Sequence, residues 1–156
     1  MSLIVSKIFT MPLSEACLWL GCKQSVQPYI LNKLNINTLI NVTPDIIFPT
    51  FVQNSVYKKI RIPIYDAPIQ NYVFHEFANT TSDFINEELY NKRNILIYCN
   101  KGMQRSPSIT VAYLMLYNGY SFHDAVNYVT KIHHIAFPNK YMTFRMPLVT
   151  LFKLRN

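Results

Sequence analysis

The sequence predicts an α/β fold: a single domain with a central, mostly parallel sheet of four to five strands flanked by helices. Short apolar runs of strand length alternate with longer amphipathic stretches, and no repeat or low-complexity linker interrupts them. The chain has 156 residues, a usual size for one domain. Hydrophobic residues make up 50% of it, which excludes a disordered tail, and it lacks the run of about 18 apolar residues that predicts a stable membrane span.

The first part of the chain predicts a strand, a helix and two further strands. Residues 16–20 and 38–42 are apolar runs of strand length, and 25–34 carries apolar residues at helical spacing between them. Residues 43–45, Thr-Pro-Asp, indicate a turn. Residues 56–62 then alternate as expected of a strand with one wetter face.

A loop at 65–68 precedes a long amphipathic helix and a buried strand. The helix is predicted by one apolar stripe, formed by Phe74, Phe77, Phe84, Ile85 and Leu89. Residues 94–98 form a compact apolar run typical of a central strand, and this strand ends at Cys99.

Two helices are expected after this strand. The first begins at Ser106-Pro107, with Ser106 as its capping residue and Pro107 at its first position, and Gly119 ends it. Ser121 with Asp124 three residues later resembles a capping box that opens the second helix.

The C-terminal part predicts one more helix. Pro138-Asn139 marks its start, and Pro147 should kink or split it. The preceding pair, His133-His134, is interpreted as surface histidines after a helix, with a place at the border of the active site as the alternative.

The polar loop after the buried strand carries the strongest chemical signal. Cys99 ends the strand, and Arg105 directly precedes the start of the next predicted helix. Free backbone N–H groups at a helix N-terminus favour an anion. We therefore expect a phosphate-binding loop that stabilises a Cys99 thiolate, with Arg105 donating to two phosphate oxygens. The Ser106 hydroxyl could stabilise the cysteine when it leaves. The loop itself consists of Asn100, Lys101, Gly102, Met103 and Gln104.

This segment resembles the Cys-x5-Arg signature loop of the protein tyrosine phosphatase superfamily, specifically the small dual-specificity phosphatases of atypical or viral type. The similarity runs from about residue 16 to near the C-terminus and includes 18–21, 34–43 and 106–115. It implies that residues 1–156 form one catalytic domain with a protein tyrosine phosphatase-like fold. It also implies a cysteine-dependent phosphatase that hydrolyses phosphotyrosine and phosphoserine/threonine in proteins through a phosphocysteine intermediate, with no cofactor and no metal.

The reaction needs a proton donor for the leaving oxygen, and Asp66 is the candidate. It lies in the loop at 65–68, where the family carries its general acid. The alternative is that Asp66 only caps the following helix. Asp45 lies in a turn signal, and Asp83 and Asp124 fall on predicted helices.

Two features of the sequence leave other functions open. Tyr98 stands where the family usually has His, so Cys99 activation is expected to be weaker or differently tuned, and a phosphate-binding module with little turnover is one alternative. From residue 92 onwards, the chain contains nine Lys and Arg residues and only one acidic residue. This basic half suggests RNA 5′-triphosphate or phosphoinositide as alternative substrates, with Lys101 either a charge at the pocket rim or a solvated surface lysine.

The cysteine count predicts a reducing environment. Three cysteines are too few for a disulfide framework, and we expect an intracellular, cytoplasmic protein, located in a host cell or a virion if the chain is viral. Cys17 and Cys22 are interpreted as structural, with Cys22 as a redox partner of Cys99 being the alternative.

Overall fold

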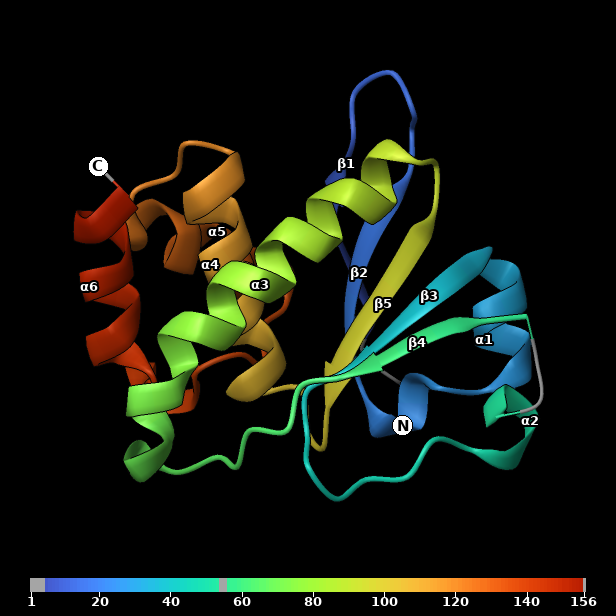
Figure 1. Cartoon of the computed structure of the whole chain (residues 1–156), viewed down its shortest axis with the longest axis horizontal. Coiled ribbons are helices and arrows are strands. Elements are labelled where there is room, and N and C mark those ends of the chain that lie inside the picture. Colours follow the sequence, from blue (N-terminus) through green and yellow to red (C-terminus); the bar gives the residue numbers. More distant parts are fainter. Residues whose placement is uncertain (1–4, 54–55, 156) are drawn as a thin grey trace.

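A computed structural model describes residues 5–53 and 56–155 and contains a five-stranded sheet (Figure 1). The strand order is β1-β2-β5-β3-β4; β1 runs antiparallel to β2, and the other neighbours are parallel. A mostly parallel sheet requires crossover connections, which the helices supply. The strands are β1 (Ser6–Thr10), β2 (Cys17–Cys22), β3 (Ile36–Asn41), β4 (Lys58–Arg61) and β5 (Asn94–Cys99).

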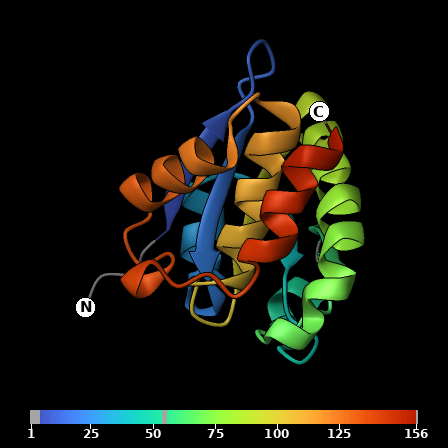
Figure 2. The ribbon, with the colours of Figure 1, turned by 90° about the vertical axis from the view of Figure 1, so that its left-hand side faces the viewer.

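Helices cover both faces of the sheet. The four later helices lie side by side on one face (Figure 2), and α1 and α2 lie on the other (Figure 1). The helices are α1 (Pro28–Lys33), α2 (Thr50–Gln53), α3 (Asn71–Tyr90), α4 (Arg105–Tyr117), α5 (Phe122–Ile132) and α6 (Arg145–Arg155). None of the helices described is long and apolar enough to span a membrane.

Strand β5 is the centre of the core, as its apolar sequence predicted. Ile95, Ile97 and Cys99 pack with the helices of the larger layer, whereas Leu96 and Tyr98 face the α1 side. All five side chains are buried. Because successive strand residues point to opposite faces, this burial delivers Cys99 to one defined side of the sheet edge.

Two elements were not predicted from the sequence. Strand β1 mixes polar and apolar residues, because it is an edge strand that pairs only with β2. Helix α2 has four residues, too few for a periodic pattern. Strand β4 covers Lys58–Arg61, the central part of the predicted 56–62 run.

The start of α4 differs from the prediction. The helix begins at Arg105, Gln104 occupies the N-cap position without a side-chain bond, and Ser106 is buried in the first turn. Ser106 as the capping residue was therefore wrong, because its hydroxyl turns to Cys99 instead. The predicted end is confirmed, since α4 stops at Tyr117 before Gly119, whose φ is 74°.

The prediction for α5 is confirmed, and that for α6 is wrong. The Ser121 hydroxyl accepts from the Asp124 amide, as proposed for the start of α5. Pro138–Lys140 form only a 3₁₀ turn, η3, because Asn139 has a left-handed φ of 57°. Helix α6 begins at Arg145, which makes Pro147 its third residue. Proline is accepted in the first turn, where the missing N–H costs no helical bond, and so no kink is needed.

A buried carboxylate joins the end of α3 to the sheet, away from the loop after β5. Glu88 accepts from the Thr38 hydroxyl at 2.6 Å and pairs with Lys58 at 2.9 Å and Arg93 at 3.0 Å. Burial alone would raise the pKa of Glu88, but the Thr38 hydrogen bond and the two cations outweigh it and hold the pKa below the ordinary 4.5. The carboxylate therefore stays charged and ties α3 to β3, to β4 and to the turn that precedes β5.

Candidate active site

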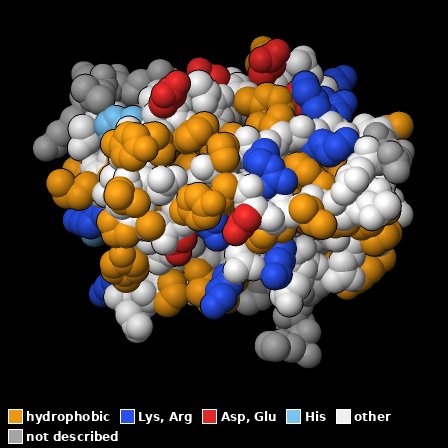
Figure 3. All heavy atoms as spheres, turned by 60° about the horizontal axis from the view of Figure 1, so that its bottom comes forward, with side chains coloured by type: hydrophobic (Ala, Val, Ile, Leu, Met, Phe, Trp, Pro, Cys, Tyr) orange, Lys and Arg blue, Asp and Glu red, His pale blue; other side chains and the backbone are white. Residues whose placement is uncertain are grey.

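A pocket of about 280 Å³ lies at the edge of the sheet where β5 ends. Figure 3 brings this edge forward and shows Lys and Arg side chains gathered over its middle and right. Seven of the nine predicted site residues line the pocket, whereas Gly102 and Ser106 lie behind its wall. The lining residues are Asp66, Cys99, Asn100, Lys101, Met103, Gln104, Arg105 and Pro138.

Cys99 sits at the base of the pocket with its sulfur held by one hydroxyl. It is the last residue of β5 and is 2% exposed. Ser106 Oγ donates to Cys99 Sγ over 3.2 Å from the first turn of α4. The contact places the hydroxyl where the sequence analysis expected it, and it can stabilise negative charge on the sulfur.

The loop after Cys99 is oriented by bonds to its carbonyl groups. Asn100 O accepts from the Lys23 amide at 3.3 Å, and Met103 O accepts from the Phe137 amide at 2.9 Å. Gly102 O accepts from His133 Nε2 at 3.0 Å. In a trans peptide the N–H points opposite to the C=O, so the amides that follow these carbonyls face away from the surrounding elements, toward the pocket. Such convergent amides form an anion-binding cradle.

Gly102 is required by its conformation and by its neighbours. Its φ is 72°, and a Cβ atom there would lie 2.9 Å from the carbonyl oxygen of Gly21. The predicted tight wrap of the loop therefore has two causes, a left-handed backbone and the close approach of β2.

His133 braces the loop from outside, and this role was not predicted. It is fully buried: Nδ1 accepts from the Ser6 hydroxyl at 2.9 Å, and Nε2–H donates to Gly102 O. Its interpretation as a surface histidine was wrong, because the segment after α5 turns inward beneath the loop. Burial lowers the pKa of His133, aided by neighbouring His134 and opposed by the Gly102 bond. The ring is therefore neutral at neutral pH and keeps this pair of roles.

Asp66 reaches the same pocket from the loop after β4. Its Oδ1 accepts from the Thr143 hydroxyl at 2.7 Å, so the carboxyl group is positioned by the segment before α6. Arg105 Nη1 donates to the carbonyl of Ile64 at 3.1 Å, which ties the phosphate loop to the strand end that leads to Asp66. The alternative interpretation, a cap for the next helix, finds no support, since the helical turn after Ala67 has no side-chain cap.

Gln104 completes a second connection between the loop and Asp66. Its side-chain Nε2 donates to Tyr141 O at 2.9 Å, and its Oε1 accepts from the Thr143 amide at 3.1 Å. The amide is 8% exposed and is fixed at both ends. Gln104 and Thr143 thus couple the geometry of the loop after Cys99 to that of the Asp66 carboxyl group.

Tyr98 lies on the opposite face of β5 from Cys99. Its hydroxyl is buried near Asn41 and Arg61 and finds no partner at ordinary hydrogen-bond distance among the described residues. Burial raises the pKa of Tyr98 far above its ordinary value, against the weaker influence of Arg61 and Asn41. The side chain is therefore neutral and brings no positive charge to Cys99, as predicted.

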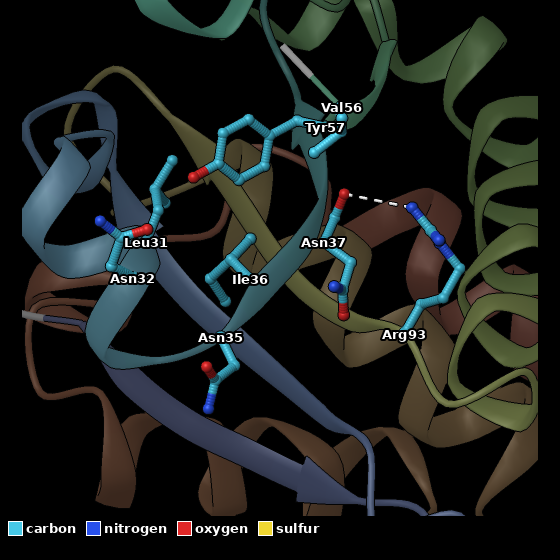
Figure 4. Close-up of a pocket in the computed structure, with 8 residues that line it drawn as sticks. All are labelled: Leu31, Asn32, Asn35, Ile36, Asn37, Val56, Tyr57 and Arg93. Carbon is cyan, nitrogen blue, oxygen red and sulfur yellow. Dashed lines mark hydrogen bonds between the residues drawn. The ribbon is translucent and has the colours of Figure 1, made fainter.

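A separate hollow of about 410 Å³ lies beside α1 and the start of β3 (Figure 4). Arg93 and Asn37 face each other in it, and Arg93 Nη2 donates to the Asn37 carbonyl at 3.3 Å. The same guanidinium is already paired with Glu88. The residues that line this hollow include no Cys, Ser, Thr, His, Asp or Glu, whereas the pocket at Cys99 contains both a thiol and a carboxyl group.

Together, a thiol at the base of an amide cradle, a guanidinium beside it and a carboxyl group across the pocket define the class of cysteine-dependent phosphatases. No metal site accompanies them in the described ranges, where no three His, Cys, Asp or Glu side chains gather. The chain belongs to the dual-specificity phosphatase family, because residues 18–148 match the family described as "Dual specificity phosphatase, catalytic domain".

Individual relatives agree with this family. The chain is 35% identical over 124 residues to Dual specificity protein phosphatase 7 of Homo sapiens, and this match covers 78% of this chain and 29% of that protein. It is 30% identical over 110 residues to Dual specificity protein phosphatase 18 of Mus musculus, covering 70% and 56%. The chain thus spans only part of the curated relatives it matches. The crystal structure of human DUSP28 shares the fold, with a TM-score of 0.79, 22% identity, and coverage of 96% of this chain and 94% of that one.

Proposed function

We propose that this chain is a cysteine-dependent protein phosphatase that hydrolyses phosphotyrosine and phosphoserine/threonine. One observation carries the proposal: the loop around Cys99 has three carbonyls bonded outward, and Asp66 lines the same pocket. Inward amides and Arg105 suit the three free oxygens of a phosphate ester, and Cys99 lies beneath them. The family supports a phosphorylated protein as substrate.

The proposed reaction has two steps. In the first, the Cys99 thiolate attacks phosphorus, the ester P–O bond breaks, and Asp66 gives its proton to the leaving oxygen. In the second, water attacks the phosphocysteine, Asp66 takes a proton from it, and the sulfur leaves as a thiolate that the Ser106 hydroxyl stabilises. Arg105 and the loop amides hold the transferring phosphoryl group in both steps.

Turnover of a small aryl phosphate tests the nucleophile. The Cys99→Ser variant should lose activity by about 10³-fold or more, because the hydroxyl is a far weaker nucleophile, while it still binds phosphate. Cys17→Ser is the matched control. Cys17 begins β2, whereas the end of that strand, Cys22, pairs with Cys99, so the control variant should keep its activity. Activity retained by Cys99→Ser would refute the proposal.

A comparison of leaving groups tests the acid. Asp66→Asn should slow the first step about 10²-fold for an alkyl phosphate and much less for an aryl phosphate with a good leaving group. Asp45→Asn is the control, because Asp45 lies outside the pocket lining. An Asp66→Asn variant with an unchanged rate on alkyl phosphates would show that another group supplies the proton.

The proposal also includes a cytoplasmic location and, as alternative substrates, other polyanions. The basic half of the chain and the exposed Lys101 at the pocket support a test of triphosphorylated RNA and phosphoinositides beside phosphopeptides. We expect phosphopeptides to be hydrolysed fastest. A weakly active phosphate-binding module, suggested by Tyr98, would instead bind phosphopeptides without turning them over.

A further inference from the structure

Five exposed apolar side chains come from segments that adjoin the pocket on its Asp66 side. They come from the loop that carries Asp66, the start of α3 and the segment that leads into α6, and their exposed fractions run from 56% to 77%. Single exposed apolar side chains are ordinary on a protein surface, whereas a contiguous apolar patch marks an interaction site. We name this group the apolar rim; it consists of Tyr65, Ile69, Tyr72, Tyr141 and Met146.

The apolar rim is continuous with the catalytic residues. Tyr65 directly precedes Asp66, and the backbone carbonyl of Tyr141 accepts from the side-chain Nε2 of Gln104 in the phosphate loop. On the outer side, His75 in α3 bonds to the carbonyl of Pro147 at 2.7 Å. This bond brings the first turns of α3 and α6 together. Tyr72, three residues before His75, lies on the same side of α3 as His75, and Met146 belongs to the first turn of α6.

The opposite side of the pocket is polar. Lys101 lines the pocket there and is exposed. In Figure 3, hydrophobic side chains gather on the left, where α6 lies and α3 begins, and Lys and Arg side chains lie mainly toward the middle and right. When the phosphate of a substrate lies at Cys99, the rest of that substrate therefore has an apolar surface beside it on one side of the pocket.

We propose that the apolar rim is a substrate-docking surface that selects phosphoprotein segments with aliphatic or aromatic residues beside the phosphorylated residue. The inference rests on the proposed function and adds a sequence preference to it. Apolar side chains of the segment would cover Ile69 and Tyr72 while the phosphate occupies the cradle, and the gain would come from burial of both partners.

Two phosphopeptides of equal charge test this preference, one with Leu and Phe flanking the phosphotyrosine and one with Ser and Thr there. The wild-type chain should show a kcat/KM about tenfold higher for the apolar peptide, mainly through KM. The double variant Ile69→Ser/Tyr72→Ser should lose this advantage, yet hydrolyse a small aryl phosphate within about twofold of wild type, because that substrate fills only the cradle.

Tyr90→Ser is the matched control. Tyr90 is the last residue of α3 and does not line the pocket. Its exposed fraction, 71%, is similar to the 77% of Tyr72. This variant should keep the preference. Equal kcat/KM for the two peptides, or a preference that survives in the double variant, would overturn the inference. So would a wild-type chain that forms dimers through the rim or binds anionic vesicles through it, with the double variant losing either property.

Peptide affinity separates failure of the surface from failure of the proposed reaction. Fluorescence polarisation of both peptides with the Cys99→Ser variant should show about tenfold tighter binding of the apolar peptide, lost when Ile69→Ser/Tyr72→Ser is added. If the wild type turns over neither peptide nor aryl phosphate but this affinity ratio holds, the catalytic proposal fails and the docking surface stands. If turnover is present and the ratio is one, only the docking surface fails.

Discussion

At the scale of single residues, one hydrogen bond from Thr143 holds Asp66, the proposed general acid. The Thr143→Val variant keeps the shape of the side chain but removes the donor to Asp66 Oδ1. We expect kcat for an alkyl phosphate to fall about tenfold, since a loosely held acid spends less time aligned with the leaving oxygen. Thr150→Val, on an exposed turn of α6, is the control. Equal loss with a good leaving group would mean that Thr143 acts on the loop as a whole.

Tyr98 offers a test in which removing a polar group should stabilise the protein. Its hydroxyl is buried without a partner at ordinary hydrogen-bond distance among the described residues, a state that costs about 1–3 kcal/mol. Tyr98→Phe should therefore raise the free energy of unfolding in urea by about 1 kcal/mol and leave kcat unchanged. A loss of stability would reveal a bond between the hydroxyl and nearby Asn41 or Arg61.

These residues also show where inference from sequence stops. Cys99, Gly102, Arg105 and Ser106 follow one another after an apolar strand, so their meeting at one site is a local property of strand, loop and helix. Thr143 meets Asp66 across 77 positions, and nothing in its own surroundings marks it. Contacts of this kind depend on the packing of distant segments.

At the scale of elements, His133 couples α5, the phosphate loop and the edge strand β1. His133→Leu retains much of the volume but leaves the Ser6 hydroxyl and the Gly102 carbonyl without their partner. Unfolding free energy should fall by about 2–4 kcal/mol, and KM for an aryl phosphate should rise several-fold because the loop loses its brace. His123→Leu, in the first turn of α5, is the control.

The neutral state of His133 has a consequence for pH. Its pKa is lowered in the folded protein, so the unfolded chain binds the proton more readily. The stability that depends on His133 is thus full above about pH 6.5 and decreases as the pH falls below it. Urea titrations between pH 7.5 and about 5.5 should show a smaller decrease for His133→Leu than for the wild type. Parallel decreases would contradict this assignment.

Glu88 holds the end of α3 to β3, to β4 and to the turn that precedes β5. Glu88→Gln keeps the size but removes the charge that Lys58 and Arg93 face, and we expect a loss of about 3–5 kcal/mol at pH 7. Because the pKa of Glu88 is lowered in the folded state, its contribution is complete above about pH 4.5 and is lost as the pH falls further. The difference between the two proteins should therefore shrink in acid. Glu87→Gln is the neighbouring control.

The predictions from sequence were best for long or central elements. Helix α3 and strand β5 follow from a continuous apolar pattern, whereas α2 is too short to show one. The start of α6 was placed wrongly because Pro138 opens a 3₁₀ turn that left-handed Asn139 cannot extend into an α-helix. Proline indicates where a helical segment can begin, but the backbone of the following residues decides whether it continues.

At the scale of the whole molecule, the sheet brings the loops after β4 and β5 to one edge, where Asp66 and Cys99 line one pocket. The chain carries a net charge of +7, and its basic residues are concentrated after residue 91. This positive field suits a dianionic ester approaching the cradle. The apolar rim then adds a second kind of recognition beside the charge.

The central claim is that Cys99 carries the phosphoryl group during turnover, and a rapid quench into denaturant tests it most directly. The wild-type chain, mixed with an aryl phosphate and quenched within milliseconds, should yield a Cys99 peptide that carries one phosphoryl group by mass spectrometry. The corresponding peptide of the Cys99→Ser variant should carry none after the same interval. An unmodified Cys99 peptide from actively turning-over protein would contradict the account, because phosphate would then pass directly to water.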